Sequence, residues 1–255
     1  MIQVTNLSKK FKLSKQQKKK MHLSGDWITA VNDVNLKCEP GRIFSLLGPN
    51  GAGKTTTLRL ISTILQPSKG SIQVAGLDAQ KEGQKVRGKI GFLTGSTGLY
   101  DRLTPEEMVA YFGKLNGMDQ EILKKRRNEL FHTLGIHKFS GKRIGELSSG
   151  MKQKVSIART MIHDPEVVIF DEPTSGLDVI TAESIIELIK QCKEQNKTVI
   201  FSSHIMSEVD LLCDDLAIIH DGGILYNDTM DQFRAQMQSD SLTKEFIRII
   251  NEQQN

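Results

Sequence analysis

The chain has 255 residues, of which 38% are hydrophobic and 25% charged, and its formal net charge is +4. This length allows one or two domains with a substantial core. No run approaches the roughly 20 apolar residues of a membrane-spanning helix, and the start lacks the pattern of a signal peptide. The net charge is too small to indicate nucleic-acid binding by itself. We therefore expect a protein that stays in the cytoplasm.

The three cysteines do not form a metal-binding or disulfide pattern. Cys38, Cys192 and Cys213 are odd in number and widely spaced. In a reducing compartment, cysteines with such spacing are typically free thiols.

The first elements along the chain are β-prone. Residues 2–4 predict a short strand, and apolar alternation resumes over residues 27–36. Between them, residues 12–25 carry five lysines and few apolar side chains, which predicts a solvated loop. These lysines could lie on anionic lipid or nucleic acid, but the absence of interleaved aromatic residues favours a simple solvated insertion between strands.

A phosphate-binding loop follows the apolar run at residues 42–47. The sequence there has the form G-x-x-x-x-G-K-[ST], and apolar residues recur at helical spacing from Leu58 to Leu65. Successive backbone N–H groups and the helix N-terminus would cradle phosphate oxygens. An incidental glycine-rich turn would not need the strand and the helix that flank it. The predicted nucleotide-binding residues are Gly48, Pro49, Asn50, Gly51, Ala52, Gly53, Lys54, Thr55 and Thr56.

Three side chains of this loop have distinct expected roles. Lys54 should reach the β- and γ-phosphates as a point charge. The hydroxyl of Thr55 should be a ligand of Mg²⁺. Thr56 can add a hydroxyl toward the α-phosphate side.

The rest of the chain alternates strands and helices, apart from a helical insertion between Leu103 and Met161 that begins at Pro105. This alternation predicts an α/β fold with a mainly parallel sheet flanked by helices. The end of the chain reads as a polar helical tail. The expected strands are 71–76, 89–94, 167–170, 198–201, 216–220 and 223–226, and a further helix is expected at 182–192.

The strand at residues 167–170 ends in two carboxylates, Asp171 and Glu172. Ligands of open α/β sheets bind at this edge. Asp171 is suited to Mg²⁺, and Glu172 is suited to orient and deprotonate an attacking water. The alternative is that Asp-Glu-Pro-Thr-Ser only begins a helix. The phosphate loop makes the catalytic interpretation preferable.

Two further motifs carry a resemblance to a known family. Residues 147–153 read Leu-Ser-Ser-Gly-Met-Lys-Gln, and residues 171–178 read Asp-Glu-Pro-Thr-Ser-Gly-Leu-Asp. Together with the phosphate loop they resemble the ATP-binding subunit of ABC transporters over nearly the whole chain. The resemblance implies a P-loop NTPase (RecA-like) parallel-sheet core, an N-terminal antiparallel β part and an inserted α-helical subdomain at about 96–160. The ATP-binding domain would span 1–235, and a helical tail would span 236–255.

The resemblance also implies how ATP and Mg²⁺ are held. Two copies would form a head-to-tail homodimer around two ATP molecules, in which Ser148 and the backbone of Gly150 contact the γ-phosphate of the partner's ATP. Asp178 would communicate between the two sites. His204 is similar to the family's switch histidine, which bonds the γ-phosphate. The metal ligands would be Thr55 and Asp171, and the catalytic residues Glu172, His204 and Lys54.

Phe11 lies where the family places an aromatic residue that stacks on adenine, and Trp27 is the competing candidate. The sequence departs from the family pattern in two places. Ser149 and Met151 replace a glycine and a glutamine of the signature, whose retained serine and glycine make the phosphate contacts. The second departure is that Gly95 stands where the family has a glutamine that touches Mg²⁺; Ser96 or a water could substitute.

The resemblance implies an ATPase subunit on the cytoplasmic face of the membrane that drives a separate integral membrane permease. The helical insertion, including residues 100–105, would dock this permease. Residues 92–98 resemble the bacterial sodium-exporter (NatA-type) branch most closely. The alternative is a drug or antibiotic exporter. A soluble ABC ATPase acting on ribosomes or nucleic acid would normally have two modules or a long coiled-coil insertion, and a generic kinase or GTPase would not explain the signature.

Overall fold

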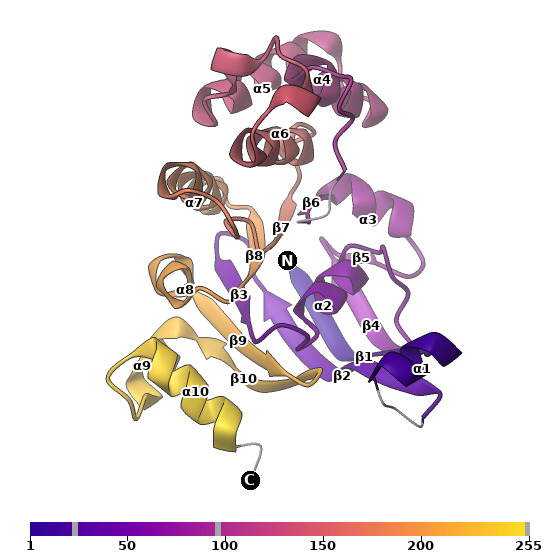
Figure 1. Ribbon diagram of the computed structural model, residues 1–255, viewed down its shortest axis with the longest axis vertical. Helices are drawn as coiled ribbons and strands as arrows, with labels where there is room; N and C mark the ends of the chain where they lie inside the picture. Colours follow the sequence, from indigo (N-terminus) through magenta and orange to yellow (C-terminus); the bar gives the residue numbers. More distant parts are fainter. Residues whose placement is uncertain (22–24, 95–97, 253–255) are drawn as a thin grey trace.

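The computed structural model describes residues 1–21, 25–94 and 98–252 (Figure 1). Its larger sheet has the strand order β10-β9-β3-β8-β7-β6. The pairs from β6 to β9 are parallel, whereas β10 is antiparallel to β9. The parallel sheet expected from the sequence is thus confirmed. Its strands are β3 (Ile43–Leu47), β6 (Ile90–Leu93), β7 (Val167–Asp171), β8 (Thr198–Ser203), β9 (Asp215–His220) and β10 (Gly223–Thr229).

The smaller sheet is antiparallel and has the order β2-β1-β4-β5. It is the expected N-terminal β part. Its inner face shares one hydrophobic core with helix α2 and with the larger sheet, and this core includes Ile2, Leu58 and Phe44. The strands are β1 (Ile2–Lys12), β2 (Trp27–Cys38), β4 (Lys69–Val74) and β5 (Leu77–Asp78), and α2 spans Lys54–Ile61.

The chain between β6 and β7 forms the expected helical subdomain, which lies at one end of the molecule (Figure 1). Thr104 begins it with a capping box: its hydroxyl accepts a hydrogen bond from the Glu107 N–H, and the Glu107 carboxylate accepts one from the Thr104 N–H. The helices are α4 (Pro105–Leu115), α5 (Gln120–Thr133) and α6 (Ser149–Met161), with short 3-10 helices at Ile136–Phe139 and Ile144–Glu146.

The remaining helices include α10, the last helix of the described chain. Helix α10 packs Leu242, Phe246 and Ile249 against the main core, so the tail that we predicted to be polar is an amphipathic helix with one partly buried side. None of the helices in the described ranges is both long and apolar enough to cross a lipid bilayer. The helices are α3 (Gly83–Lys89), α7 (Val179–Glu194), α8 (Met206–Leu212), α9 (Met230–Gln236) and α10 (Leu242–Glu252).

The lysine-rich segment corrects one prediction. Instead of a loop over residues 12–25, the structure has a helix, α1 (Lys15–Met21), and β1 continues to Lys12. Lysine and glutamine are good helix formers because they lose little rotamer freedom in a helix. Lys18 of this helix forms an ion pair with Asp26, which lies just before β2.

A second correction concerns the end of α2. Apolar spacing predicts a helix through Leu65, but α2 ends at Ile61, and Ile64 is 59% exposed. The reason is local, because Thr63 adopts a left-handed conformation with φ of 62° and cannot continue a right-handed helix.

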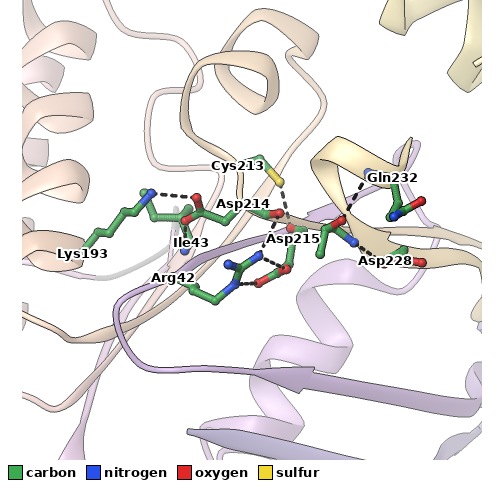
Figure 2. A network of polar contacts seen from close by, with 9 residues as sticks. Arg42, Ile43, Lys193, Cys213, Asp214, Asp215, Asp228 and Gln232 are labelled. Carbon is green, nitrogen blue, oxygen red and sulfur yellow. Dashed lines mark hydrogen bonds and ion pairs between the residues drawn. The ribbon is translucent and has the colours of Figure 1, made fainter. Parts of the chain in front are cut away.

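A polar network lies at the end of the larger sheet at which the neighbouring strands β3 and β9 begin (Figure 2). The guanidinium of Arg42 donates two hydrogen bonds to the carboxylate of Asp215, at 2.7 and 2.5 Å. Asp214 accepts from the N–H of Ile43 at 2.9 Å and from the ammonium of Lys193, at the end of α7, at 2.7 Å. The phosphate loop follows the opposite end of β3, so this network holds the sheet that carries the loop.

Candidate functional site

The loop between β3 and α2 has the backbone of a phosphate cradle. Gly51 and Gly53 have φ of 84° and 108°, a region that side chains disfavour. A Cβ on Gly53 would lie 2.6 Å from the carbonyl oxygen of Ala30. Only glycine therefore fits at residue 53, which directly precedes the N-terminus of α2. The donor groups of the loop and the helix N-terminus suit an anion such as a phosphate.

A cavity of about 150 Å³ opens at this loop. Its walls include most of the nucleotide-binding residues predicted from the sequence, and they also include Glu172. Gly48 and Ala52 do not line the cavity but support the loop. Ala52 is only 2% exposed, and the carbonyl oxygen of Gly48 accepts a hydrogen bond from the ammonium of Lys54. The lining residues are Ala30, Pro49, Asn50, Gly51, Gly53, Lys54, Thr55, Thr56 and Glu172.

Lys54 is the buried cation of the site. Its side chain is 4% exposed, and its ammonium donates to the carbonyl oxygens of Gly48 at 2.6 Å and Pro49 at 3.1 Å. The same nitrogen lies 3.5 Å from a carboxylate oxygen of Glu172. A buried ammonium with carbonyl and carboxylate partners can bind phosphate oxygens when they enter the loop.

Thr55 and Asp171 meet across α2 and β7. The Thr55 hydroxyl donates to Oδ1 of Asp171 at 3.1 Å, and the Ser202 hydroxyl donates to the same oxygen at 2.7 Å. These hard oxygen donors fit Mg²⁺, which is commonly held by one or two protein oxygens together with substrate phosphates and water. Within the described ranges no group of three or more histidine, cysteine or acidic residues gathers as a metal site.

Glu172 and His204 face each other. Nδ1 of His204, in the loop after β8, lies 3.3 Å from Oε2 of Glu172. Glu172 thus lies between the ammonium of Lys54 and the imidazole of His204. The side chains of Glu172 and His204 are 28% and 45% exposed, so water can reach the pair. A carboxylate held in this way can orient a water and accept its proton.

The signature residues lie apart from the loop cavity. Ser148 caps α6, since its hydroxyl accepts a hydrogen bond from the N–H of Met151 at 3.3 Å, and Gly150 lies in the first turn of that helix. Asp178 caps α7 and accepts from the N–H and the hydroxyl of Thr181. The N–H bond lowers the pKa of Asp178. The walls of the loop cavity come from other residues.

A larger cavity of about 610 Å³ separates α6 from the turn after Glu172. It is lined by Ser149, Lys152 and Gln153 on one side and by Glu172 and Leu177 on the other. The signature helix and Glu172 thus line the same cavity.

The two candidates for stacking on adenine lie on neighbouring strands, β1 and β2. Phe11 pairs with Ile28 across β1 and β2, and the ammonium of Lys9 lies 5.1 Å from the centre of its ring. Trp27 is 59% exposed on β2. Gly95, and Ser96 as its substitute, lie outside the described residues.

Sequence reasoning missed several polar residues that hold Glu172 and the loops on either side of it. Ser202 accepts from the Glu172 N–H at 3.1 Å, and Gln153 donates to the carbonyl oxygen of Pro173 at 2.9 Å. Glu208 accepts from the hydroxyl groups of Thr174 and Ser203. The only signal for them in the sequence was their position close to recognised motifs.

Comparison with known proteins finds a family match and similar relatives. The ABC transporter family matches residues 31–175. The chain is 43% identical to the ABC transporter ATP-binding protein NatA of Bacillus subtilis, over 97% of each chain, in agreement with the NatA-type resemblance. It is 36% identical to the linearmycin resistance ATP-binding protein LnrL of the same organism, over 88% of this chain and 72% of LnrL.

The fold also matches a solved structure with a bound nucleotide. The ATP-binding cassette MJ0796, in a dimeric post-hydrolysis state with ADP and Pi, superposes with a TM-score of 0.79 at 27% identity, over 90% of this chain and 99% of that one. Sequence and fold thus both indicate an ATP-binding subunit. The chain belongs to the ABC transporter family, as one of its ATP-binding subunits.

Proposed function

We propose that this chain hydrolyses ATP at the site formed by Lys54, Glu172 and His204, and that hydrolysis drives sodium export through a separate membrane subunit. The observation that carries the ATPase assignment is the position of Glu172. One of its oxygens lies 3.5 Å from the ammonium of Lys54 and the other lies 3.3 Å from the imidazole of His204, at the mouth of the phosphate loop.

Each residue then has one task in the reaction. Lys54 binds the β- and γ-phosphates and offsets their negative charge. Glu172 orients the attacking water and takes its proton, and His204 donates a hydrogen bond to the γ-phosphate. Mg²⁺, held through Thr55 and Asp171, would neutralise further phosphate charge when it is bound. Phe11 would stack on the adenine.

The site is completed by a second copy of the chain. In the proposed head-to-tail homodimer, Ser148 and the N–H of Gly150 close over the partner's ATP from the N-terminus of α6. The dimeric form of MJ0796 supports this arrangement. ATP binding would close the dimer, and hydrolysis would reopen it.

The helical subdomain is the proposed docking face for an integral membrane permease. Tyr100 and Tyr111 are about half exposed there, and their ring centres are 6.3 Å apart. Large exposed aromatic residues that lie together are common in protein interfaces. Through this contact the chain would be held at the cytoplasmic face of the membrane, with no nucleic-acid partner.

Sodium is the proposed substrate because of the similarity to the NatA-type branch, which spans nearly the whole of both chains. A second candidate is antibiotic export, favoured by the similarity to LnrL, which spans less of that relative. ATP hydrolysis at the chain's own site would serve either candidate, and we assign substrate specificity to the membrane subunit.

The test is ATP-driven uptake of radioactive sodium ions into inside-out vesicles that contain this chain and its membrane subunit. Vesicles with native protein should accumulate sodium, and vesicles with Glu172→Gln should not. If native vesicles show ATPase activity but no sodium uptake, the sodium assignment is wrong, and uptake of linearmycin by the same vesicles would support the second candidate.

A further inference from the structure

Glu208 is a buried carboxylate that the proposed chemistry does not use. It lies on the short helix α8, and only 9% of it is exposed. Its described hydrogen-bond partners are hydroxyl groups: Oε1 accepts from Thr174, and Oε2 accepts from Ser203 at 3.0 Å. Burying a carboxylate costs free energy, so we expect a carboxylate buried between two hydroxyl groups to have a specific role.

The two hydroxyl groups belong to two different catalytic loops. Thr174 follows Glu172 by two residues, in the turn after β7. Ser203 directly precedes His204, at the end of β8. The Ser203 hydroxyl also accepts a hydrogen bond of 2.9 Å from the N–H of Ile205, so it fixes the backbone on both sides of His204. Glu208 therefore connects the loop of the proposed base to the loop of the switch histidine.

The turn that carries Glu172 needs such support because its backbone is strained. Glu172 has φ of 50°, a left-handed conformation that costs free energy for a residue with a side chain. Its N–H is held by the hydroxyl of Ser202 at 3.1 Å, on the strand side of the turn. Glu208 holds the other side of the turn through Thr174.

The distance between Glu172 and His204 depends on the relative position of these two loops. Both side chains are partly exposed, so packing of the side chains alone does not fix their separation of 3.3 Å. The buried bridge Thr174–Glu208–Ser203 joins the loop that carries Glu172 to the loop that carries His204.

We propose that Glu208 is a positioning residue for ATP hydrolysis: through Thr174 and Ser203 it sets the separation of Glu172 and His204. This inference rests on the proposed ATPase function. Glu208 does not reach the phosphate cavity, whose lining residues come from other elements. Its loss should therefore affect the rate of the chemical step much more than the binding of ATP.

The first test compares Glu208→Ala with Glu208→Gln. Glu208→Ala should lower kcat at least about tenfold, because two hydrogen bonds that orient catalytic loops are lost, and the Kd for ATP should change less than about twofold. Glu208→Gln should recover a large part of kcat, since its amide oxygen can still accept a hydroxyl hydrogen bond. The matched control is Asp210→Asn, which changes an exposed carboxylate on the same helix, paired with Arg234.

A second test avoids any folding defect of Glu208→Ala. Thr174→Val keeps the shape of the side chain but removes its hydroxyl, so it should lower kcat with little change in the Kd for ATP. In a double-mutant cycle, Thr174→Val combined with Glu208→Ala should lose less than the product of the two single effects, because both break the same bridge.

The outcomes separate the bridge from the ATPase assignment. If native protein turns over ATP and Thr174→Val and the folded Glu208 variants keep native kcat, the bridge has no positioning role. Equal losses in kcat and ATP affinity would indicate a structural role and would also overturn the proposal. If native protein with its membrane subunit has no ATPase activity, the proposed function itself is wrong, and the inference falls with it.

Discussion

The side-chain amide of Gln153 donates a hydrogen bond of 2.9 Å to the carbonyl oxygen of Pro173. Gln153 lies on α6, the helix that begins at the signature residues, and Pro173 directly follows Glu172. In the proposed dimer, the N-terminus of α6 contacts the partner's ATP. In that dimer, this hydrogen bond would connect the subunit's contact with one ATP molecule to Glu172, the proposed base for the other ATP molecule.

Replacing Gln153 tests this connection. Gln153→Ala should lower kcat about threefold to tenfold, the effect of one lost hydrogen bond on the position of Glu172, while the Kd for ATP stays close to native. Steady-state ATPase assays with equilibrium nucleotide binding measure both quantities. Lys154→Ala, which changes the next residue on the same helix, is the control. A native kcat for Gln153→Ala would rule out the connection.

The glycine at residue 53 should be indispensable for nucleotide binding. In Gly53→Ala the new Cβ would lie 2.6 Å from the carbonyl oxygen of Ala30 in a backbone with φ of 108°, so the loop must distort. Fluorescent ATP analogues should lose most of their affinity. Gly76→Ala is the matched control: its φ is 79° but it has open space around the Cβ, so it should cost about 1–2 kcal/mol of stability and leave binding intact. If Gly53→Ala binds the ATP analogues with native affinity, the assignment of this loop as a phosphate-binding site is wrong.

Removing the buried ammonium should abolish tight ATP binding without unfolding the chain. Lys54→Ala leaves carbonyl groups of the loop that water can satisfy, but it removes the charge that faces the phosphates. Calorimetric titration with ATP should show a loss of affinity of at least about a hundredfold, a loss expected of a charged contact. The exposed change Lys190→Ala should have no effect. Undiminished binding in Lys54→Ala would exclude the phosphate-loop assignment.

The thiols predict how stability depends on pH. The structure confirms that Cys38, Cys192 and Cys213 are free. Burial raises the pKa of Cys192 to about 12 and also raises that of Cys38. Unfolded thiols ionise above a pH of about 8.5, so above that pH the unfolded chain binds fewer protons than the folded chain.

The free energy of unfolding should consequently fall as the pH rises above about 8.5, by up to about 1.4 kcal/mol per pH unit for each buried thiol. Urea denaturation at a series of pH values measures this slope. Cys192→Ala should reduce the slope relative to native protein. An identical slope in the two proteins would show that this thiol does not ionise on unfolding in that range.

The site could be predicted from sequence where its residues are local neighbours. The phosphate loop and the pair Asp171–Glu172 each carry their spacing within a few residues, and in the structure Glu172 lines the cavity of the loop while Asp171 accepts a hydrogen bond from Thr55. The helical insertion and the parallel sheet were also predictable, because apolar periodicity is a local signal.

Other features depend on contacts that no local pattern records. The partners Thr174 and Glu208 are 34 residues apart in the sequence, and only the parallel pairing of β7 and β8 brings their loops together. The helix α1 was not predicted because a run of lysines indicates solvent exposure but does not distinguish a helix from a loop. The end of α2 depends on one left-handed residue, Thr63, which helical periodicity does not reveal.

The most direct test of the central claim is the molar mass of Glu172→Gln with ATP and Mg²⁺, measured by size-exclusion chromatography with light scattering. We expect Glu172 to activate the water in a site that a second copy completes. This variant should therefore bind ATP but hydrolyse it at least about a hundredfold more slowly than native protein. Its measured molar mass should be twice that of the monomer. Glu187→Gln, an exposed change on α7, should turn over ATP like native protein. A Glu172→Gln protein that is loaded with ATP but remains monomeric, or that hydrolyses ATP at the native rate, would contradict the account.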